Sequence, residues 1–343
     1  MSLMDEVLDG LRLHSTVFSR MTLAGEWGFA KDELQGAPFH LVLSGRACCR
    51  LDGEAAAQPL EAGDIVILPH GNRHRLLAHP HVEPIPWRRV IDQMGLTQWK
   101  PGMRFKSVDL RYGEGEPVTT LISGVFAFGH RRKNPLLESL PPILLVRAGE
   151  KNSAAEAVAS VTSLLDTELL SGKPGAESVA ARLGDILFIQ VIRHYLTASN
   201  ELPPGWLRGL ADRELGAAIA LMHAEPNRHW SVASLAHELA MSRSRFAARF
   251  QEVVGQGPLE YLTQWRMYQA AGRLAEGKVP LSALALSSGY RSEVAFSKAF
   301  KRWAGLSPVE YRRSLEQASQ PIEPPIIGAQ SSGDGAAPDG EER

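Results

Sequence analysis

The sequence predicts an α+β protein with a β-barrel near its N-terminus, helices in the middle and an all-α domain with two helix-turn-helix units near its C-terminus. Three observations lead to this fold class. Short apolar runs alternate with turn residues between positions 38 and about 130, which is typical of closely spaced strands. Apolar residues recur at helical spacing from Ser153 onward, and a short segment near the C-terminus occurs twice.

The predicted strands are separated by residues that tolerate tight turns. We expect strands at Phe39–Leu43, Ala47–Leu51, Ile65–Leu68 and Thr119–Phe128. The turn residues between them are Ser44-Gly45, Asp52-Gly53, Gly63-Asp64 and His70-Gly71-Asn72. This pattern favours a barrel or a sandwich. Residues 81–118 are rich in Pro, Trp and Gly and are too irregular to assign.

Two amphipathic helices follow the β region. The first is predicted at Ala154–Leu170, before a Gly-Lys-Pro-Gly turn, and the second covers Ala176–Ala198. One face of the second helix carries an apolar stripe of Val179, Leu183, Ile186 and Leu187. The stripe predicts a homodimer contact, although it would also suit packing on the barrel.

The remaining segments complete the predicted organisation. Leu202–Gly205 is interpreted as a linker, and Asp212–His223 begins another helix. The Pro-, Gly-, Ser- and acid-rich end is predicted to be disordered. The chain is therefore divided into a barrel domain at 1–150, a helical linker and dimerisation region at 151–205, a helix-turn-helix domain at 206–316 and a disordered tail at 317–343.

The composition is that of a globular protein, with 44% hydrophobic and 22% charged residues. The first six residues include two acidic and no basic ones, unlike the start of a signal peptide, and no apolar run approaches the roughly 18 residues of a membrane span. Cys48 and Cys49 are adjacent, which excludes a disulfide framework and fits a reducing compartment. We therefore expect a cytoplasmic protein with no membrane partner.

Charge is distributed unevenly along the chain. The whole sequence has a formal net charge of −1, but residues 226–313 contain thirteen Lys and Arg against six acidic residues. That segment carries +7 and the remainder −8. Because phosphate binding depends on local charge, this asymmetry indicates a nucleic-acid partner for the C-terminal part.

The C-terminal part contains an internal duplication. Ser242–Phe250 lies 50 residues before Ser292–Phe300. At the same offset the following residues match: Phe246 and Phe296, Phe250 and Phe300, Gly255 and Gly305, Pro258 and Pro308, Glu260 and Glu310, Tyr261 and Tyr311. Upstream the offset is 49, because the second turn has gained one residue. So many matches at two adjacent offsets indicate a repeated structural unit.

Each copy has the pattern of a helix-turn-helix. A short helix, Val232–Leu239 or Leu281–Ser288, precedes a tight turn, after which Ser242 or Ser292 is placed to cap the next helix. The two phenylalanines of each copy are spaced i, i+4 and point inward, and a glycine ends the helix. A long helix, Pro258–Glu276, joins the copies. A plain helical bundle is the alternative, but two basic copies argue against it.

Residues 226–313 resemble the DNA-binding domain of the AraC/XylS family of transcription regulators. The resemblance rests on Ser242–Phe250, Tyr261–Met267, Gly289–Ser292 and Phe296–Arg312. It implies two recognition helices that enter adjacent major grooves of double-stranded DNA, with RNA polymerase as a further partner. Family members activate or repress transcription, and the sequence leaves open which of the two applies, as it does the operator.

The resemblance also implies which residues contact DNA. They lie on and beside the second helix of each copy: Arg243, Ser244, Arg245, Ala247, Ala248, Arg249, Ser292, Glu293, Val294, Ala295, Ser297, Lys298, Lys301 and Arg302. We expect Arg245 and Lys298 at base edges, and Arg249, Lys301 and Arg302 at phosphates. Ala248 departs from the family, which often has a base-reading Arg there.

The N-terminal domain resembles a cupin. Gly63–His74 has the spacing G-x5-P-x-G-x2-H of the second cupin motif, whose His points into a small barrel. This implies a cupin-like sensor domain with an effector pocket lined by Phe39, His40, Leu41 and His74. The first cupin motif is incomplete because Val42 replaces its second His. We therefore expect no metal and no cofactor, with His40, His70 and His74 as the candidate ligands if a metal were bound.

The sequence therefore predicts a regulator that binds DNA under the control of an effector or redox signal, and not an enzyme. A small apolar or aromatic effector is expected, and thiol sensing at Cys48-Cys49 is an alternative, although adjacent strand residues point to opposite faces. A cupin enzyme and a DNA-independent adaptor are the rival functions. The incomplete metal-ligand set argues against the enzyme, and the duplicated basic units argue against the adaptor.

Overall fold

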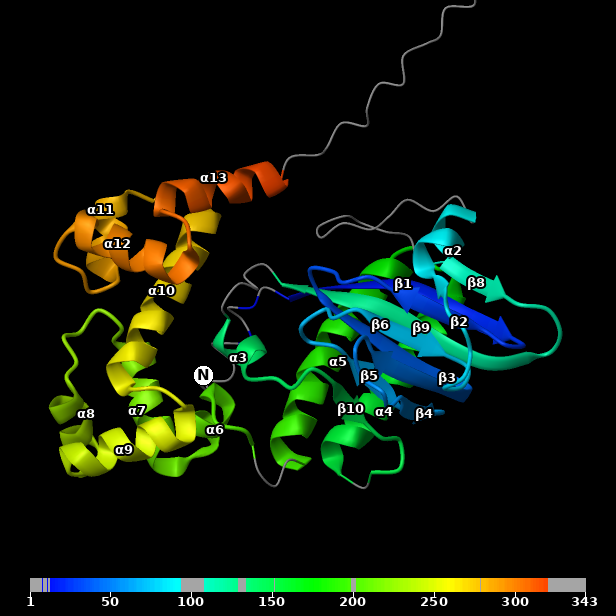
Figure 1. Ribbon diagram of the computed structural model, residues 1–343, viewed down its shortest axis with the longest axis horizontal. Helices are drawn as coiled ribbons and strands as arrows, with labels where there is room; N and C mark the ends of the chain where they lie inside the picture. Colours follow the sequence, from blue (N-terminus) through cyan, green and yellow to red (C-terminus); the bar gives the residue numbers. More distant parts are fainter. Residues whose placement is uncertain are drawn as a thin grey trace, which may run out of the picture.

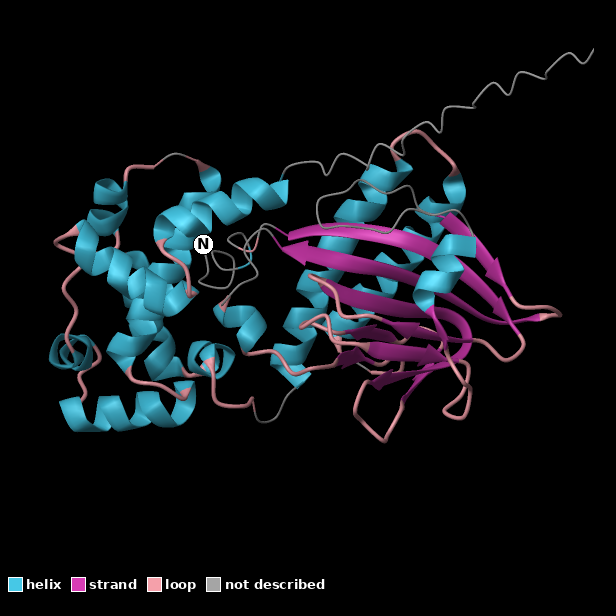
Figure 2. Cartoon of the chain, turned by 45° about the horizontal axis from the view of Figure 1, so that its top comes forward, coloured by secondary structure: helices cyan, strands magenta, loops and turns pink. Residues whose placement is uncertain are grey.

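The structure is a computed structural model that describes residues 8, 11, 13–93, 108–128, 134–150, 152–198, 202–277 and 279–319 (Figure 1). A strand-rich part and a helical part lie side by side, with two long helices behind the strands (Figure 2). The tail expected to be disordered lies outside the described residues from position 320 onward. The predicted mixture of a β domain and an all-α domain is confirmed.

The described strands form one curled ten-stranded sheet. Their order is β7-β2-β6-β3-β9-β1-β8, with β4 and β5 added to β3, and β10 to β5. Because β7 and β8 lie at the two ends of this order, the cupin-like sheet is an open half-barrel. Its strands are β1 Leu13–Ala24, β2 Gly28–Lys31, β3 Ala37–Leu51, β4 Gln58–Glu61, β5 Ile65–Ile67, β6 His74–Leu77, β7 Ile85–Pro86, β8 Val108–Tyr112, β9 Pro117–Phe128 and β10 Leu144–Val146.

The turn predicted at Ser44-Gly45 is wrong, because β3 runs through it as a single strand. Its pairing with β9 shifts register between Val42 and Ser44, and Gly45 has φ +77°. An added Cβ on Gly45 would lie 1.9 Å from the Val118 carbonyl oxygen, so only glycine fits there. The chain therefore bends at a bulge, and the strand continues around the curl of the sheet.

The first strands, β1 and β2, were not predicted from the sequence. β1 pairs with β9 antiparallel and with β8 parallel, so it lies inside the sheet and not at its edge. The segment left unassigned contains β7, the short helix α2 (Trp87–Gln93) and β8. The apolar and polar residues of β1 alternate only irregularly, and β1 contains none of the turn residues by which the other strands were recognised.

Two helices cover one face of the sheet, as Figure 2 shows. These are α4 (Ser153–Ser171) and α5 (Ala176–Ala198), which agree with the predicted helices to within one residue at each end. Gly184 of α5 lies so close to β1 that an added Cβ would meet the Ser15 Cβ at 2.6 Å. Asp185 accepts hydrogen bonds from the backbone N–H and the hydroxyl of Ser15 at 2.8 and 2.7 Å. Much of the α5 surface therefore packs on the sheet.

The C-terminal part consists of helices joined by short turns. Figure 1 shows the long helix α10 running between a unit that contains α8 and α9 and a unit that contains α11 and α12. The helices are α6 Trp206–Ala211, α7 Arg213–Ala224, α8 Val232–Glu238, α9 Arg243–Val254, α10 Pro258–Glu276, α11 Leu281–Ser287, α12 Glu293–Ala304 and α13 Pro308–Ser319. A one-turn helix, α3 (Pro135–Glu138), lies between this part and the sheet.

Buried side chains form two clusters. One lies inside the curl of the sheet and includes Trp27, Phe29 and Val42. The other begins on the opposite face of the sheet, where Phe39 stacks on Phe126 at 4.6 Å between ring centroids. It continues through α3, α4 and α5 into the C-terminal helices without interruption. The sheet and the helical part therefore share one continuous core.

Candidate functional site

The two helix-turn-helix units are built on the same local contacts. The Ser242 hydroxyl accepts from the Arg245 backbone N–H at 3.3 Å, and the Ser292 hydroxyl accepts from the Ala295 N–H at 3.2 Å. Each hydroxyl thereby caps the second helix of its unit, α9 or α12. Both helices then end at a glycine with φ near +80°, which is the left-handed C-cap expected from the sequence.

The two turns also follow the same path. The backbone N–H of Met241 donates to the Ala236 carbonyl at 2.9 Å, and that of Tyr290 donates to the Ala285 carbonyl at 2.8 Å. Both turns contain a residue with positive φ. In the second unit it is Gly289, at +77°, whereas in the first it is Ala240, at +52°, the one such non-glycine residue in the described part of the chain.

The phenylalanine pairs hold the recognition helices in place. Phe246, Phe250, Phe296 and Phe300 are each 0% exposed. Phe250 packs edge-on against Tyr261 of α10 at 5.7 Å, and Phe300 packs in the same way against Tyr311 of α13 at 5.4 Å. Because the phenylalanines face inward, the remaining sides of α9 and α12 face solvent.

None of the fourteen residues expected to contact DNA is buried. On α9, Arg243, Ser244, Arg245 and Ala248 are exposed, and Ala247 and Arg249 are half-buried. At α12 the exposed residues are Ser292, Glu293, Val294, Ala295, Lys298, Lys301 and Arg302, and Ser297 is half-buried. The two faces are therefore accessible, and they carry both basic and apolar side chains.

Acidic residues of α7 hold two arginines of α9. Asp212, the N-cap of α7, lies 3.0 Å from Arg249, which also reaches Glu252 at 3.4 Å. Glu214, in the first turn of α7, lies 3.6 Å from Arg245. The sequence placed Arg249 at a phosphate, or at a base in compensation for Ala248, and gave no sign of either α7 partner, because residues more than thirty positions apart have no recognisable spacing.

Three further basic residues of the +7 segment are used inside the fold. Arg266 donates to the carbonyls of Pro226 and Arg228, Arg312 donates to the Val279 carbonyl, and Arg273 donates to the Ser287 hydroxyl. Their guanidinium groups therefore tie helices together. The charge count of the segment overstates the positive charge that it can offer to a ligand.

A second polar group lies inside the curled sheet. His40 and His74 are each 1% exposed, and their Nε2 atoms lie 2.9 Å apart. The Asn72 carbonyl can only accept, so His74 Nδ1 carries a proton and donates to it at 2.9 Å. Burial lowers the pKa of His74 to about 4 and that of His40 well below its usual range. In neutral rings, His74 Nε2 then accepts from His40, and His40 Nδ1 accepts from the Ser123 hydroxyl at 2.7 Å.

Lys31 is the residue of this group that sequence reasoning missed. It lies opposite His74 in the pairing of β2 with β6, and its ammonium is 4.0 Å from the centroid of the Trp87 ring. Desolvation lowers the pKa of Lys31 to about 7. β2 is only four residues long and carries no motif, so the sequence gives little signal for an inward lysine.

The four residues expected to line one pocket do not share a face. Phe39 and Leu41 belong to the cluster against the helices, whereas His40 and Val42 point into the curl. Successive residues of a strand point to opposite sides, so His40 cannot share a face with its two neighbours. His70 is directed elsewhere, with Nε2 2.9 Å from the Leu140 carbonyl. Within the described ranges, no three His, Cys, Asp or Glu side chains gather as a metal would need.

The adjacent cysteines are both buried, at 7% and 0% exposure. Burial raises the pKa of the Cys48 thiol, and it raises that of Cys49 to about 12. The thiolate is the reactive form of cysteine, so both side chains are disfavoured as nucleophiles towards an oxidant. The geometry thus favours His40, His74 and Lys31 over the thiols as the polar groups of this interior.

A duplicated helix-turn-helix with exposed basic faces, attached to a curled cupin sheet, defines the class of two-domain DNA-binding transcription regulators. The comparisons agree: residues 3–197 match the family described as Cupin, and residues 235–314 match the family described as Helix-turn-helix domain. An AraC-like transcription regulator of Streptomyces antibioticus is 36% identical over 310 residues, covering 90% of this chain and 98% of the relative. This chain belongs to the AraC-like transcription regulators, and it is not an enzyme.

Further similarities, to one curated relative and two solved structures, are more distant. The RCS-specific HTH-type transcriptional activator RclR of Escherichia coli is 27% identical over 305 residues, covering 88% of this chain and 94% of RclR. Among solved structures, ToxT of Vibrio cholerae is 14% identical with a TM-score of 0.35, over 89% of this chain and 98% of ToxT. The DNA-binding domain of AdpA, solved with a target DNA, is 30% identical over 32% of this chain and 97% of that domain, with a TM-score of 0.30.

No helix in the described part of the chain is both long and apolar enough to cross a membrane.

Proposed function

We propose that this protein binds a specific promoter sequence by placing α9 and α12 in successive major grooves of duplex DNA. The observation that carries the proposal is the matched presentation of the two helices. Each is capped by a serine, held by two buried phenylalanines and exposed along its outer side. Paired readers of this kind contact sites about one helical turn apart, roughly 34 Å. We expect the protein to do so in the cytoplasm, with RNA polymerase as its partner at the promoter.

Arg245 and Lys298 are the proposed readers of bases. Both lie within the first two turns of their helices and are exposed. Selection from random DNA with the full-length protein would define the motif. Arg245→Ala and Lys298→Ala are then each expected to cost about 1–3 kcal/mol of binding free energy and to relax preference at different positions. If the motif is unchanged in both variants, these helices are not the readers.

Lys301 and Arg302 are the proposed phosphate contacts, because they lie further along α12 and are exposed. Lys301→Ala should weaken binding to all sequences alike and reduce the slope of log affinity against log salt by about 0.9. Arg313→Ala removes an exposed positive charge from α13, outside the two reading helices, and serves as the control. Equal slope changes in the two variants would contradict a specific role for Lys301.

We also propose that a small apolar or aromatic effector binds inside the curled sheet, with a polar group facing Lys31, His40 and His74. The support is an apolar interior in which, among the described residues, these three polar side chains gather, and the two histidines are held neutral. A compound that changes DNA binding should be retained by the purified protein in equilibrium dialysis. Lys31→Met and His74→Leu should both weaken retention while leaving DNA binding without the compound unchanged. Unchanged retention in both variants would contradict the pocket.

A homodimer contact through α5 is the third part of the proposal. Leu187 of the expected stripe is fully buried and Leu183 is half-buried, but Val179 and Ile186 are 44% and 43% exposed and lie seven residues apart. A helical spacing of seven places them on one side. Ile186→Asp should convert a dimer to a monomer in light scattering, with Thr167→Asp on the exposed side of α4 as the control. A mass unaffected by Ile186→Asp would contradict this interface.

A further inference from the structure

The outer side of α12 differs chemically from that of α9. The first turn of α9 presents three exposed side chains that donate hydrogen bonds: Arg243, Ser244 and Arg245. The first turn of α12 presents an acid and two apolar side chains at the equivalent exposed positions: Glu293, Val294 and Ala295. None of these three side chains of α12 can donate a hydrogen bond at neutral pH, so this turn recognises DNA differently from its counterpart in α9.

Val294 is an apolar side chain that its own domain leaves uncovered. It is 64% exposed, and among the exposed large apolar residues in the described ranges only Leu286 of α11 exceeds it, at 73%. Single apolar residues are common on protein surfaces, so exposure alone does not indicate a contact. The position of Val294 on α12 is what makes its exposure informative.

Val294 lies on the side of α12 that faces away from the core. Phe296 follows two residues later and is fully buried, and at about 100° per residue Val294 is about 200° away from it around the helix. Lys298, the proposed base reader of α12, comes four residues after Val294 and is exposed on the same face. The N-terminal residues of a recognition helix are the ones that approach base edges. In the proposed binding mode Val294 therefore faces the bases.

The local structure fixes the direction in which the two methyl groups of Val294 point. A β-branched residue in a helix has one strongly preferred χ1 rotamer. The backbone around Val294 is fixed as well, because the Ser292 hydroxyl accepts from the Ala295 N–H at 3.2 Å and caps the helix. The side chain therefore loses little conformational freedom when it contacts a base.

The chemistry of valine limits the base that it can recognise. In the major groove guanine presents acceptors, cytosine a donor, and adenine an acceptor and a donor. Valine can pair with none of these groups, so a contact would remove their hydrogen bonds to water without replacing them. Phosphate oxygens are unsuitable for the same reason. Among the four bases, thymine alone presents an apolar group there, its C5 methyl group.

We propose that Val294 contacts the C5 methyl group of a thymine and thereby makes thymine the preferred base at one position of the α12 half-site. The contact rests on the proposed insertion of α12 into the major groove, and it adds the identity of one base to that proposal. Residues four apart on a helix are about 5–6 Å apart, and successive base pairs are about 3.4 Å apart. The thymine therefore lies within about two base pairs of the position that depends on Lys298. The α9 half-site lacks this contact, because Ser244, which has no methyl group, occupies the matching position.

The test replaces thymine by uracil, which removes the C5 methyl group and keeps the O4 acceptor. Selection from random DNA with the full-length protein defines the motif and, with Lys298→Ala, the position that depends on Lys298. Each thymine within two base pairs of that position, on either strand, is then replaced in turn, and binding is measured by fluorescence anisotropy at one salt concentration. One replacement should weaken binding about fourfold, the effect of one buried methyl group. If no replacement does so, or if the motif has no thymine within that distance, Val294 does not read thymine.

Two valine variants show whether Val294 is the residue that contacts the methyl group. In Val294→Ala the shortened side chain no longer reaches the base, so the effect of the same uracil replacement should fall below twofold. Val309→Ala is the matched control, because it shortens an exposed valine of α13, outside the recognition helices, and should keep the fourfold effect. An effect that persists in Val294→Ala would overturn the proposal. A selection that yields no motif would instead contradict the proposed DNA-binding mode, and the thymine contact with it.

Discussion

The two helix-turn-helix units share a buried frame but differ on their surfaces. The serine cap, the phenylalanine pair and the C-cap glycine occur in both, with nearly the same hydrogen bonds. On the surface, Arg245 and Arg249 of the first unit lie against Glu214 and Asp212 of α7. Within the described residues, Lys298, Lys301 and Arg302 of the second unit make no ion pair. Packing thus accounts for the shared frame, whereas the exposed surfaces of the two units differ.

The largest effect should come from the shared frame. Phe250→Ala and Phe300→Ala each remove a fully buried ring at equivalent positions, so each should lower the free energy of unfolding by about 3–5 kcal/mol. Urea unfolding followed by circular dichroism measures this. The two costs should agree within about 1 kcal/mol. A much smaller cost in one unit would show that the frames are not equivalent.

A buried histidine distinguishes the first unit from the second at low pH. His223 of α7 stacks on Trp265 at 3.6 Å and is 2% exposed, and burial lowers its pKa to about 3. Above the unfolded-state pKa near 6.5 the ring is neutral in both states, and its effect on stability is constant. Below pH 6.5 the unfolded state binds more protons than the folded state, so the free energy of unfolding decreases as the pH is lowered. At pH 5 this residue lowers it by about 2 kcal/mol. His223→Gln should reduce that loss in unfolding measured at pH 7 and pH 5, and an unchanged loss would contradict the assignment.

The two turns provide a smaller contrast. Gly289 has φ +77° and Ala240 has φ +52°, a region that costs a side chain about 1–2 kcal/mol. Gly289→Ala should therefore lower stability by about 1 kcal/mol, whereas Ala240→Gly should leave it unchanged or raise it slightly. Thermal unfolding of both variants compares them directly. Destabilisation of equal size in both would mean that the turns do not differ in strain.

The smallest expected effect concerns the acid beside Arg245. The Glu214 and Arg245 side chains are 51% and 67% exposed and 3.6 Å apart, so their interaction is worth less than about 1 kcal/mol. Glu214→Gln should release the arginine and tighten DNA binding about twofold, measured by fluorescence anisotropy. Glu260→Gln removes the same charge from an exposed position of α10 and controls for net charge. Equal tightening in both variants would show that Glu214 has no specific influence.

The sequence predicted most of the helical part because its signals are local. The serine caps, glycine C-caps and phenylalanine spacing repeat within each unit, and the predicted helices agree with the observed ones to within one residue. In the sheet, the bulge at Gly45 was interpreted as a turn, because a glycine after a serine suits both. Phe39 and Leu41 were placed in the pocket, although strand alternation turns them away from His40.

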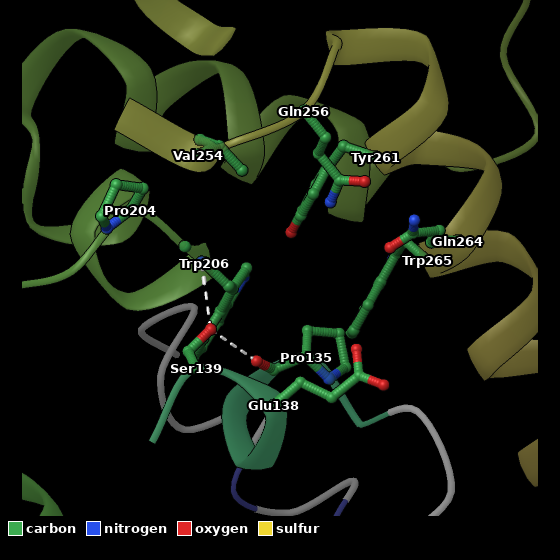
Figure 3. A pocket seen from close by; sticks show the side chains of 11 residues that line it. Pro135, Glu138, Ser139, Pro204, Trp206, Val254, Gln256, Tyr261, Gln264 and Trp265 are labelled. Atoms are coloured by element: carbon green, nitrogen blue, oxygen red, sulfur yellow. Dashed lines mark hydrogen bonds between the residues drawn. The ribbon is translucent and has the colours of Figure 1, made fainter. Parts of the chain in front are cut away.

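Contacts between distant segments could not be predicted. Lys31 reaches the interior only because β2 pairs with β6, and Arg249 is held only because α7 begins beside α9. Neither pairing leaves a pattern in the sequence. The cavity bordered by α3, α6 and α10 (Figure 3) likewise depends on three segments that are more than forty residues apart along the chain. Local sequence patterns indicate which residues lie on the recognition helices, but they do not indicate which distant residues contact them.

In the proposed binding mode, the helix α10 also sets the phase of the two recognition helices along DNA. It has nineteen residues, and at 1.5 Å per residue it is about 28 Å long. Because it is continuous, one residue added to or deleted from it would rotate one unit against the other by about 100°. The two recognition helices would then face different sides of the double helix, and no rearrangement within either unit would restore the register. Changes in length should therefore be tolerated in the loops at either end of α10, and not within it.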